Sequence, residues 1–113
     1  MPTYVISTPP SANALFHNRK GGRFKTRAYV AWIKGELLAL AAQRAKPIGV
    51  RAGISIKLPR KTRGDCDNRI KPVLDLLVRA GILVDDRSDY VASVSISYGD
   101  VEMCHVTVLP EAA

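Results

Sequence analysis

The sequence predicts an α+β fold: one domain over residues 1–113, with two helices packed on one face of a mixed sheet. Three observations support this prediction. The chain has 113 residues, enough for one compact domain and too few for two of ordinary size. Apolar residues recur at helical spacing in two segments, and in other segments they alternate with polar residues, as in a strand. These segments follow one another in the order β-α-β-α-β-β, for which a sheet layer and a helix layer are the simplest packing.

The N-terminal half is expected to contain a strand, a long loop and a helix. Residues 3–8 are rich in β-branched and aromatic side chains and predict a strand, which two prolines end. Residues 11–25 show no apolar period and contain two glycines, so we expect a basic loop. A helix is expected over residues 26–45, because Thr26 is a favourable N-cap and apolar residues then recur at three- and four-residue steps.

The C-terminal half is expected to contain three strands and a second helix. Residues 50–58 alternate between apolar and polar and predict a strand with one buried face. Residues 68–80 carry an apolar stripe, and a proline near their start predicts an irregular first turn. Residues 92–98 and 101–109 again alternate, and the Gly-Asp pair between them predicts a two-residue hairpin turn.

The charge of the chain favours an anionic partner. The formal net charge is +7, and nine of the basic residues lie in the two segments 17–27 and 57–63. A solvated surface explains either segment alone, but the second leads directly into acidic residues, which favours phosphate binding and hence nucleic acid. Phe16 and Phe24 are candidates either for base stacking or for anchoring the first segment to the core. The candidate DNA-binding residues are Arg19, Lys20, Arg23, Lys25, Lys57, Arg60, Lys61 and Arg63.

Other classes of protein are disfavoured. No apolar run is long enough to cross a bilayer, and the N-terminus lacks the pattern of a signal peptide, so we expect a soluble cytoplasmic protein without membrane contact. Cys66 and Cys104 have neither the number nor the spacing of a disulfide framework or a cysteine metal site.

The acidic residues are concentrated in one stretch. Residues 64–89 hold six of the ten, with Asp65 and Asp67 at the front and the pair Asp85 and Asp86 near the end. Taken singly, the first two would be helix caps and the last two turn residues. The remaining aspartates, Asp75, Asp89 and Asp100, are assigned to exposed or turn positions.

Taken together, the carboxylates suit a divalent cation, because Mg²⁺ prefers hard oxygen ligands. In an extended D-x-D segment, Asp65 and Asp67 would point to the same side and could share one cation. A third carboxylate from the later pair would complete a triad, and Lys71 could hold a phosphate oxygen. These are the parts that metal-assisted phosphodiester hydrolysis requires.

The ordered set DCDNRIKPVLDLLVRAGILVDD, residues 65–86, resembles the signature of RusA-type Holliday junction resolvases, which are crossover junction endodeoxyribonucleases. The resemblance extends more weakly to the N-terminal strand, the PPSAN segment after it and the basic loop. It implies a RusA-like fold and a homodimeric endonuclease that cuts four-way DNA junctions by paired symmetric nicks. It also implies Mg²⁺ as the cofactor, with Mn²⁺ as a substitute.

The resemblance also implies roles for individual residues. The residues that match the family's catalytic set are Asp65, Asp67, Lys71 and Asp86, and the three aspartates among them are the metal ligands. Asp85 is the adjacent acid, with a supporting or ligand role, and Asn68 matches a supporting position.

Several alternatives stay open at this level. A helix over residues 68–80 would span about 20 Å, which six extended residues can cover, so the triad could close within one subunit or require a second. Trp32 and the apolar face of the last two strands are candidates for the dimer interface. The alternative function is a non-catalytic basic nucleic-acid-binding module, in which the aspartates have no metal affinity. A phosphoesterase for small substrates is disfavoured by the charge of +7.

Overall fold

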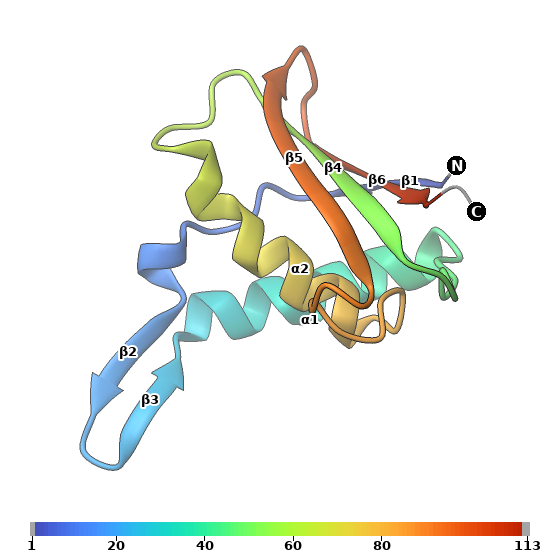
Figure 1. Cartoon of the computed structure of the whole chain (residues 1–113). Coiled ribbons are helices and arrows are strands. Elements are labelled where there is room, and N and C mark those ends of the chain that lie inside the picture. Colours follow the sequence, from blue (N-terminus) through green and yellow to red (C-terminus); the bar gives the residue numbers. More distant parts are fainter. Residues whose placement is uncertain (1, 112–113) are drawn as a thin grey trace.

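The computed structural model describes residues 2–111 and contains a four-stranded sheet, a separate two-stranded hairpin and two α-helices (Figure 1). The main sheet has the order β1-β6-β4-β5. Its β4 and β5 are parallel and its other pairs antiparallel, so the predicted mixed sheet is confirmed. The strands of this sheet are β1 (Thr3–Ile6), β4 (Ala52–Pro59), β5 (Val91–Gly99) and β6 (Cys104–Pro110).

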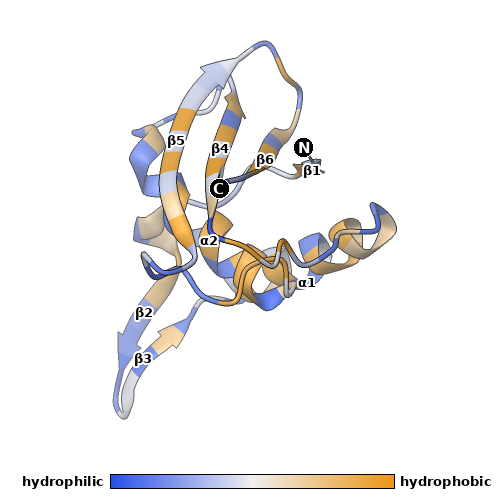
Figure 2. Ribbon diagram, turned by 45° about the vertical axis from the view of Figure 1, so that its right-hand side comes forward, coloured by the Kyte–Doolittle hydropathy of each residue, from blue (hydrophilic) through white to orange (hydrophobic). Residues whose placement is uncertain are grey.

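Two helices, α1 (Arg27–Ala42) and α2 (Ile70–Arg79), contribute to one core against the sheet, as predicted. Strand residues alternate between this core and solvent, which Figure 2 shows as alternating bands along β4, β5 and β6. The fully buried core includes Leu40 of α1, Val73, Leu76 and Leu77 of α2, and Ile54, Ile56, Leu58, Val106 and Val108 of the sheet. Within residues 2–111, neither helix is long and apolar enough to span a membrane.

Both helices begin as the sequence predicts. Thr26 is the N-cap of α1, and its hydroxyl accepts a hydrogen bond from the backbone N–H of Tyr29 (3.2 Å). The helix ends at Ala42, three residues before the expected end, because Arg44 adopts a left-handed φ of 58° that cannot continue it. A 3₁₀ turn, η2 (Cys66–Arg69), precedes α2, which confirms the expected irregular start of the second helix.

The prediction of a loop over residues 11–25 is wrong. The segment forms a 3₁₀ turn, η1 (Ala12–Ala14), and an antiparallel hairpin of β2 (Phe16–Arg19) and β3 (Gly22–Lys25). The hairpin projects away from the sheet and helices (Figure 1). Gly21, with φ at 101°, supplies a turn conformation that most residues avoid. Apolar alternation does not reveal these strands, because the hairpin carries cations on both faces and buries little apolar surface of its own.

The predicted hairpin turn at Gly99-Asp100 is also wrong. Strand β4 lies between β5 and β6, so the chain after β5 crosses over the end of β4 before it starts β6. The crossing is close: a Cβ at Gly99 would lie 2.6 Å from Cδ of Lys57, and the carbonyl of Gly99 accepts a hydrogen bond from the Arg60 N–H (3.0 Å). Strands β4 and β5 pair in parallel because α2 provides the crossover that a parallel pair needs.

Burial also removes the β6 part of one candidate dimer interface, while the apolar residues of β5 are half-buried. The apolar face of β6, carrying Cys104, Val106 and Val108, is fully buried beneath the helices and is not available to a partner. Trp32 is half-buried, stacks on Tyr29 and donates a hydrogen bond from Nε1 to the Ser7 carbonyl (3.3 Å). The β6 face therefore serves packing within the chain, whereas the interface role of Trp32 stays a prediction.

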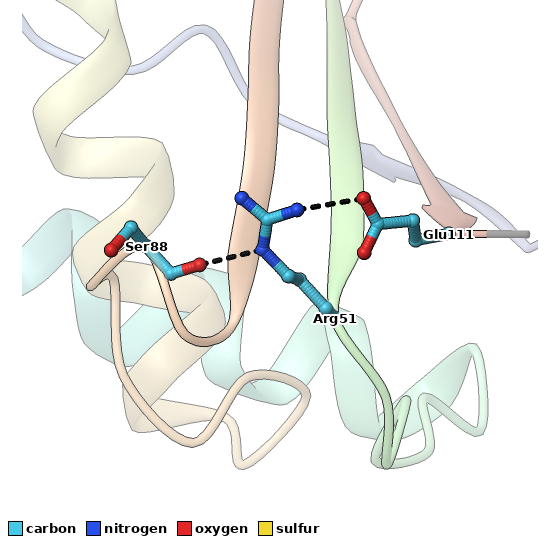
Figure 3. A network of polar contacts seen from close by, with 3 residues as sticks. All are labelled: Arg51, Ser88 and Glu111. Atoms are coloured by element: carbon cyan, nitrogen blue, oxygen red, sulfur yellow. Dashed lines mark hydrogen bonds and ion pairs between the residues drawn. The ribbon is translucent and has the colours of Figure 1, made fainter. Parts of the chain in front are cut away.

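The loop between α2 and β5, which carries Asp85 and Asp86, is tied to the end of the sheet. Arg51 donates from Nε to the Ser88 carbonyl (2.6 Å) and from Nη1 to the Glu111 carboxylate (2.7 Å) (Figure 3). One guanidinium thus connects this loop to the residue after β6.

The two cysteines are expected to differ strongly in reactivity. Cys104 is fully buried in β6, and burial, with a smaller contribution from Glu36, raises the pKa of its thiol to about 12, whereas Cys66 is half-buried in η2. We expect one thiol per chain to react with a disulfide reagent in the native protein at mildly alkaline pH, and the second only after denaturation. Cys66→Ser should abolish native labelling. Two fast native thiols would contradict the burial of Cys104.

Candidate active site

The first pair of candidate carboxylates lies at the start of α2. Asp65 has an extended backbone (φ −77°, ψ 132°) and is the N-cap of η2, while Asp67 lies inside that 3₁₀ turn. The expectation of an extended D-x-D segment is therefore wrong, because side chains alternate regularly only along an extended backbone. Asp65 occupies the cap position, but its side chain makes no capping hydrogen bond. A capping hydrogen bond thus does not explain the carboxylate of Asp65.

Two side chains that sequence reasoning missed hold this turn in place. The Tyr98 hydroxyl, on β5, donates to the Gly64 carbonyl (2.8 Å). Arg69 donates from Nη1 to the Pro9 carbonyl (2.6 Å) and from Nη2 to the Arg63 carbonyl (2.9 Å). Arg69 and Tyr98 therefore join the turn to the N-terminal segment, the basic loop and the sheet, contacts that no local pattern reveals.

The phenol of Tyr98 is suited to this role. Partial desolvation, followed by the nearby charges of Cys66 and Asp65, raises its pKa above the usual value for tyrosine. The hydroxyl consequently keeps its proton, and remains a donor to Gly64, throughout the physiological pH range.

Asn68 contributes to the same turn through its backbone. Its N–H donates to the Asp65 carbonyl (3.2 Å), and among residues 2–111 its half-buried side chain makes no hydrogen bond. A structural role for the backbone at this position is therefore visible, and a role for the side chain stays a prediction.

The second pair of candidate carboxylates lies beyond the end of α2. The Asp85 side chain accepts a hydrogen bond from the Asp86 backbone N–H (2.8 Å) and pairs with Arg87 Nε (3.0 Å). Asp86 is exposed. The pair thus forms a turn in which Asp85 satisfies local groups and leaves the Asp86 side chain free to bind a ligand.

A groove connects this turn to the middle of α2. Its volume is about 330 Å³, and its lining residues are Phe16, Lys25, Asp75, Val78, Arg79, Asp85 and Asp86. The assignment of Asp75 to an exposed or turn position is therefore wrong. Asp75 is half-buried, accepts a hydrogen bond from the Tyr29 hydroxyl (2.7 Å) and lies 3.8 Å from Lys71 Nζ. The four-residue spacing from Lys71 is the one local signal that pointed to this position.

The two carboxylate pairs are not brought together within one chain. The ten residues of α2, about 15 Å long, separate the turn before the helix from the turn after it (Figure 1). The segment 81–86 runs back far enough to share a groove with Asp75, but the turn that carries Asp65 is not part of that groove. Within residues 2–111, no three His, Cys, Asp or Glu side chains are close enough together to hold a metal ion.

The carboxylates differ in whether they already have a hydrogen-bond or ion-pair partner in the protein. In the part of the chain that the structure describes, Asp65, Asp67 and Asp86 are exposed and their side chains make no hydrogen bond or ion pair. By contrast, Asp85 and Asp100 are each paired with an arginine. Free, exposed carboxylate oxygens are the hard donors that Mg²⁺ selects, so the chemistry of the donor set fits this metal.

The first basic segment forms the projecting hairpin. Arg19 lies over the ring of Phe24 (4.2 Å) and Arg23 over the ring of Phe16 (4.0 Å). Phe16 also contacts the buried Tyr29 edge to face (centroids 5.9 Å apart), so it anchors the hairpin, as one of the two alternatives expected. The other hairpin cations are Lys20, which is exposed, and Lys25, which lines the groove.

The second basic segment leads from the end of β4 into the turn that carries Asp65. Lys57, Arg60, Lys61 and Arg63 are all exposed. Arg60 pairs with Asp100 (2.9 Å) across the crossing after β5. For Lys61 and Arg63 no ion pair is found among residues 2–111, so their charges face solvent beside the first pair of carboxylates.

Fold and site together define a class: a small basic α+β protein whose free carboxylates lie beside exposed cations. Comparison with known proteins gives the family. The family model described as endodeoxyribonuclease RusA matches residues 7–108, so the chain belongs to the RusA endodeoxyribonuclease family. Membership implies nuclease activity of the Holliday junction resolvase kind. No curated protein matches the sequence.

Proposed function

We propose that this chain is a Mg²⁺-dependent endonuclease that acts as a homodimer on four-way DNA junctions and resolves them by paired symmetric nicks in the cytoplasm. One observation supports this most strongly. The three aspartates to which the resemblance assigns the catalytic role, Asp65, Asp67 and Asp86, are exposed and have no partner within residues 2–111. Free carboxylates at these three positions, in a chain with a charge of +7, support a bound cation.

We assign the following roles to the residues. Asp65, Asp67 and Asp86 would hold Mg²⁺, with Asp85 beside them. When bound, the metal supplies polarisation of the scissile phosphate and activation of water. Lys71, whose side chain is 52% exposed, would bind a phosphate oxygen and offset the negative charge that develops on it. The hairpin and the loop before Asp65 would bind the DNA backbone.

We further propose that each site is completed across the dimer. One chain keeps its two groups of carboxylates at opposite ends of α2. A two-fold dimer could place the start of α2 of one subunit against the 81–86 segment of the other and so unite them. Such a dimer has two identical sites related by symmetry, which suits a substrate that is itself nearly two-fold and requires two opposed cuts.

The alternative is a basic module that binds nucleic acid without cutting it. That function would leave the carboxylates as helix caps and turn residues. The lack of a capping hydrogen bond from Asp65 and the free side chain of Asp86 argue against it. Family membership also favours the nuclease.

A cleavage assay on a labelled four-way junction separates the two functions. We expect paired nicks in the presence of Mg²⁺, restoration by Mn²⁺ after chelation, and no cut in linear duplex of the same sequence. Tight junction binding without cleavage in either metal would support the binding module and overturn the nuclease.

Lys61 is expected to contribute mainly to electrostatic binding. Because its ammonium is exposed and unpaired among the described residues, Lys61→Ala should remove one phosphate contact and lower the slope of log K against log salt by about 0.9. Binding to junction and to duplex should weaken alike. Lys46→Ala is the matched control, since Lys46 is also exposed but lies beyond the C-terminal end of α1. An unchanged slope would exclude Lys61 from the DNA interface.

A further inference from the structure

We infer that Asp75 and Tyr29 are positioning residues that hold Lys71 for its contact with phosphate; the inference rests on the proposed function of Lys71. The observation is that one carboxylate oxygen of Asp75 faces both Tyr29 and Lys71. Asp75 Oδ2 accepts a hydrogen bond from the Tyr29 hydroxyl (2.7 Å) and lies 3.8 Å from Lys71 Nζ. One carboxylate therefore joins a buried phenol of α1 to an exposed ammonium on α2.

Tyr29 is a rigid support for this contact. Its side chain is 0% exposed, and its ring contacts those of Phe16 and Trp32, with centroids 5.9 and 6.4 Å away. Its backbone N–H donates to the N-cap hydroxyl of Thr26 (3.2 Å), which fixes the first turn of α1. Burial, and then the hydrogen bond to Asp75, raise the pKa of Tyr29 far above its usual value, so the phenol remains a donor.

The lysine–aspartate pair would be weak without this support. Lys71 precedes Asp75 by four residues, and a base N-terminal to the acid is the less favourable order on a helix. The two side chains are 52% and 26% exposed, so water and salt screen the attraction. Because the Tyr29 hydroxyl fixes the orientation of the Asp75 carboxylate, the ammonium has one defined site on the helix surface.

This arrangement has a direct consequence for catalysis. A lysine side chain has several rotatable bonds, and ordering it for each reaction costs conformational entropy. Asp75 holds the ammonium of Lys71 against the first turns of α2, the end of the helix next to Asp65 and Asp67. The ammonium is thereby restricted to the start of α2 before DNA binds.

A direct role of Asp75 as a metal ligand is the competing explanation. The geometry favours positioning, because Asp75 Oδ2 already faces two donors, whereas Asp86 in the same groove has no partner among the described residues. The two roles predict different responses to the Mg²⁺ concentration, which makes them separable.

The kinetic experiment measures the single-turnover cleavage rate, the junction Kd and the Mg²⁺ dependence. Asp75→Asn should lower the rate by about ten- to a hundredfold, the usual effect of removing a supporting contact, with Kd and Mg²⁺ dependence unchanged. Tyr29→Phe should give a smaller loss in the same direction. In a Lys71→Ala background neither change should have any further effect. Tyr4→Phe is the control for loss of a buried phenol, since the Tyr4 hydroxyl contacts the Lys46 N–H (3.4 Å), away from the site.

Two results would overturn the inference. An additive loss in the Lys71→Ala background would show that Asp75 does not act through the lysine. A higher Mg²⁺ requirement in Asp75→Asn would make Asp75 a metal ligand instead.

A second measurement keeps the contact testable apart from cleavage. Nitrogen NMR of the lysine ammonium groups in the DNA-free protein should show Lys71 Nζ with slowed proton exchange, lost in Asp75→Asn and kept in Tyr4→Phe. If the wild type cuts no junction but shows this signal, the proposed function fails, and the positioning role fails with it, leaving a structural contact. If the wild type cuts junctions and the signal is unaffected by Asp75→Asn, only the inference fails.

Discussion

Asp67→Asn is expected to abolish junction cleavage while leaving junction binding intact or tighter. Asp67 is exposed and its carboxylate makes no contact within residues 2–111, so the nearly isosteric amide should not disturb the fold. Loss of one anionic ligand would weaken the binding of the metal ion that stabilises the transition state. We therefore expect the cleavage rate to fall by about a thousandfold or more. Binding should not weaken, because a negative charge near DNA phosphate is removed.

The matched control is Asp89→Asn. Asp89 lies in the same acidic stretch, is exposed, and has no side-chain partner among the described residues. The Asp89→Asn change removes the same charge from the chain and leaves both candidate pairs intact. The cleavage rate of this variant should therefore equal that of the wild type. The measurement is single-turnover cleavage of a labelled four-way junction, with binding followed separately in a chelator. Full activity of Asp67→Asn would remove this residue from the active site.

Mixing Asp67→Asn with Asp86→Asn is expected to restore activity to two proteins that are each inactive. If each site combines the start of α2 of one subunit with the 81–86 segment of the other, a mixed dimer contains one site with both changes and one intact site. After random exchange in an equal mixture, about half of the dimers are mixed, so about a quarter of all sites should be intact. Those dimers should nick one strand of a junction without the paired cut.

A site built within one subunit predicts the opposite result. Every subunit in the mixture then carries a change, and no activity returns. A mixture of Asp67→Asn with Asp65→Asn is the control, because both residues lie in the same turn. A dimer of those two variants has no intact site under either arrangement. Recovery in the control would indicate exchange artefacts or residual activity in the single variants.

Local sequence patterns determined most of the elements. The apolar stripe of α2, the alternation along β4, β5 and β6, and the Thr26 cap each depend on residues within a few positions of one another. The concentration of carboxylates between residues 64 and 89 is likewise a local feature, and the family resemblance that it carried is confirmed by the match over residues 7–108. The catalytic roles of the individual aspartates stay predictions.

Contacts between distant segments decided the rest. The place of β4 between β5 and β6 depends on pairing across the sheet, and the hairpin of β2 and β3 is held by Phe16 against Tyr29 of α1. The hydrogen bond from Tyr29 to Asp75 joins residues 46 positions apart, so no local pattern places this helical aspartate in the groove. The separation of Asp65 and Asp67 from Asp86 follows from the path of the chain around α2. Short-range periodicity fixes which residues share a face, whereas the free energy of long-range packing decides which faces meet.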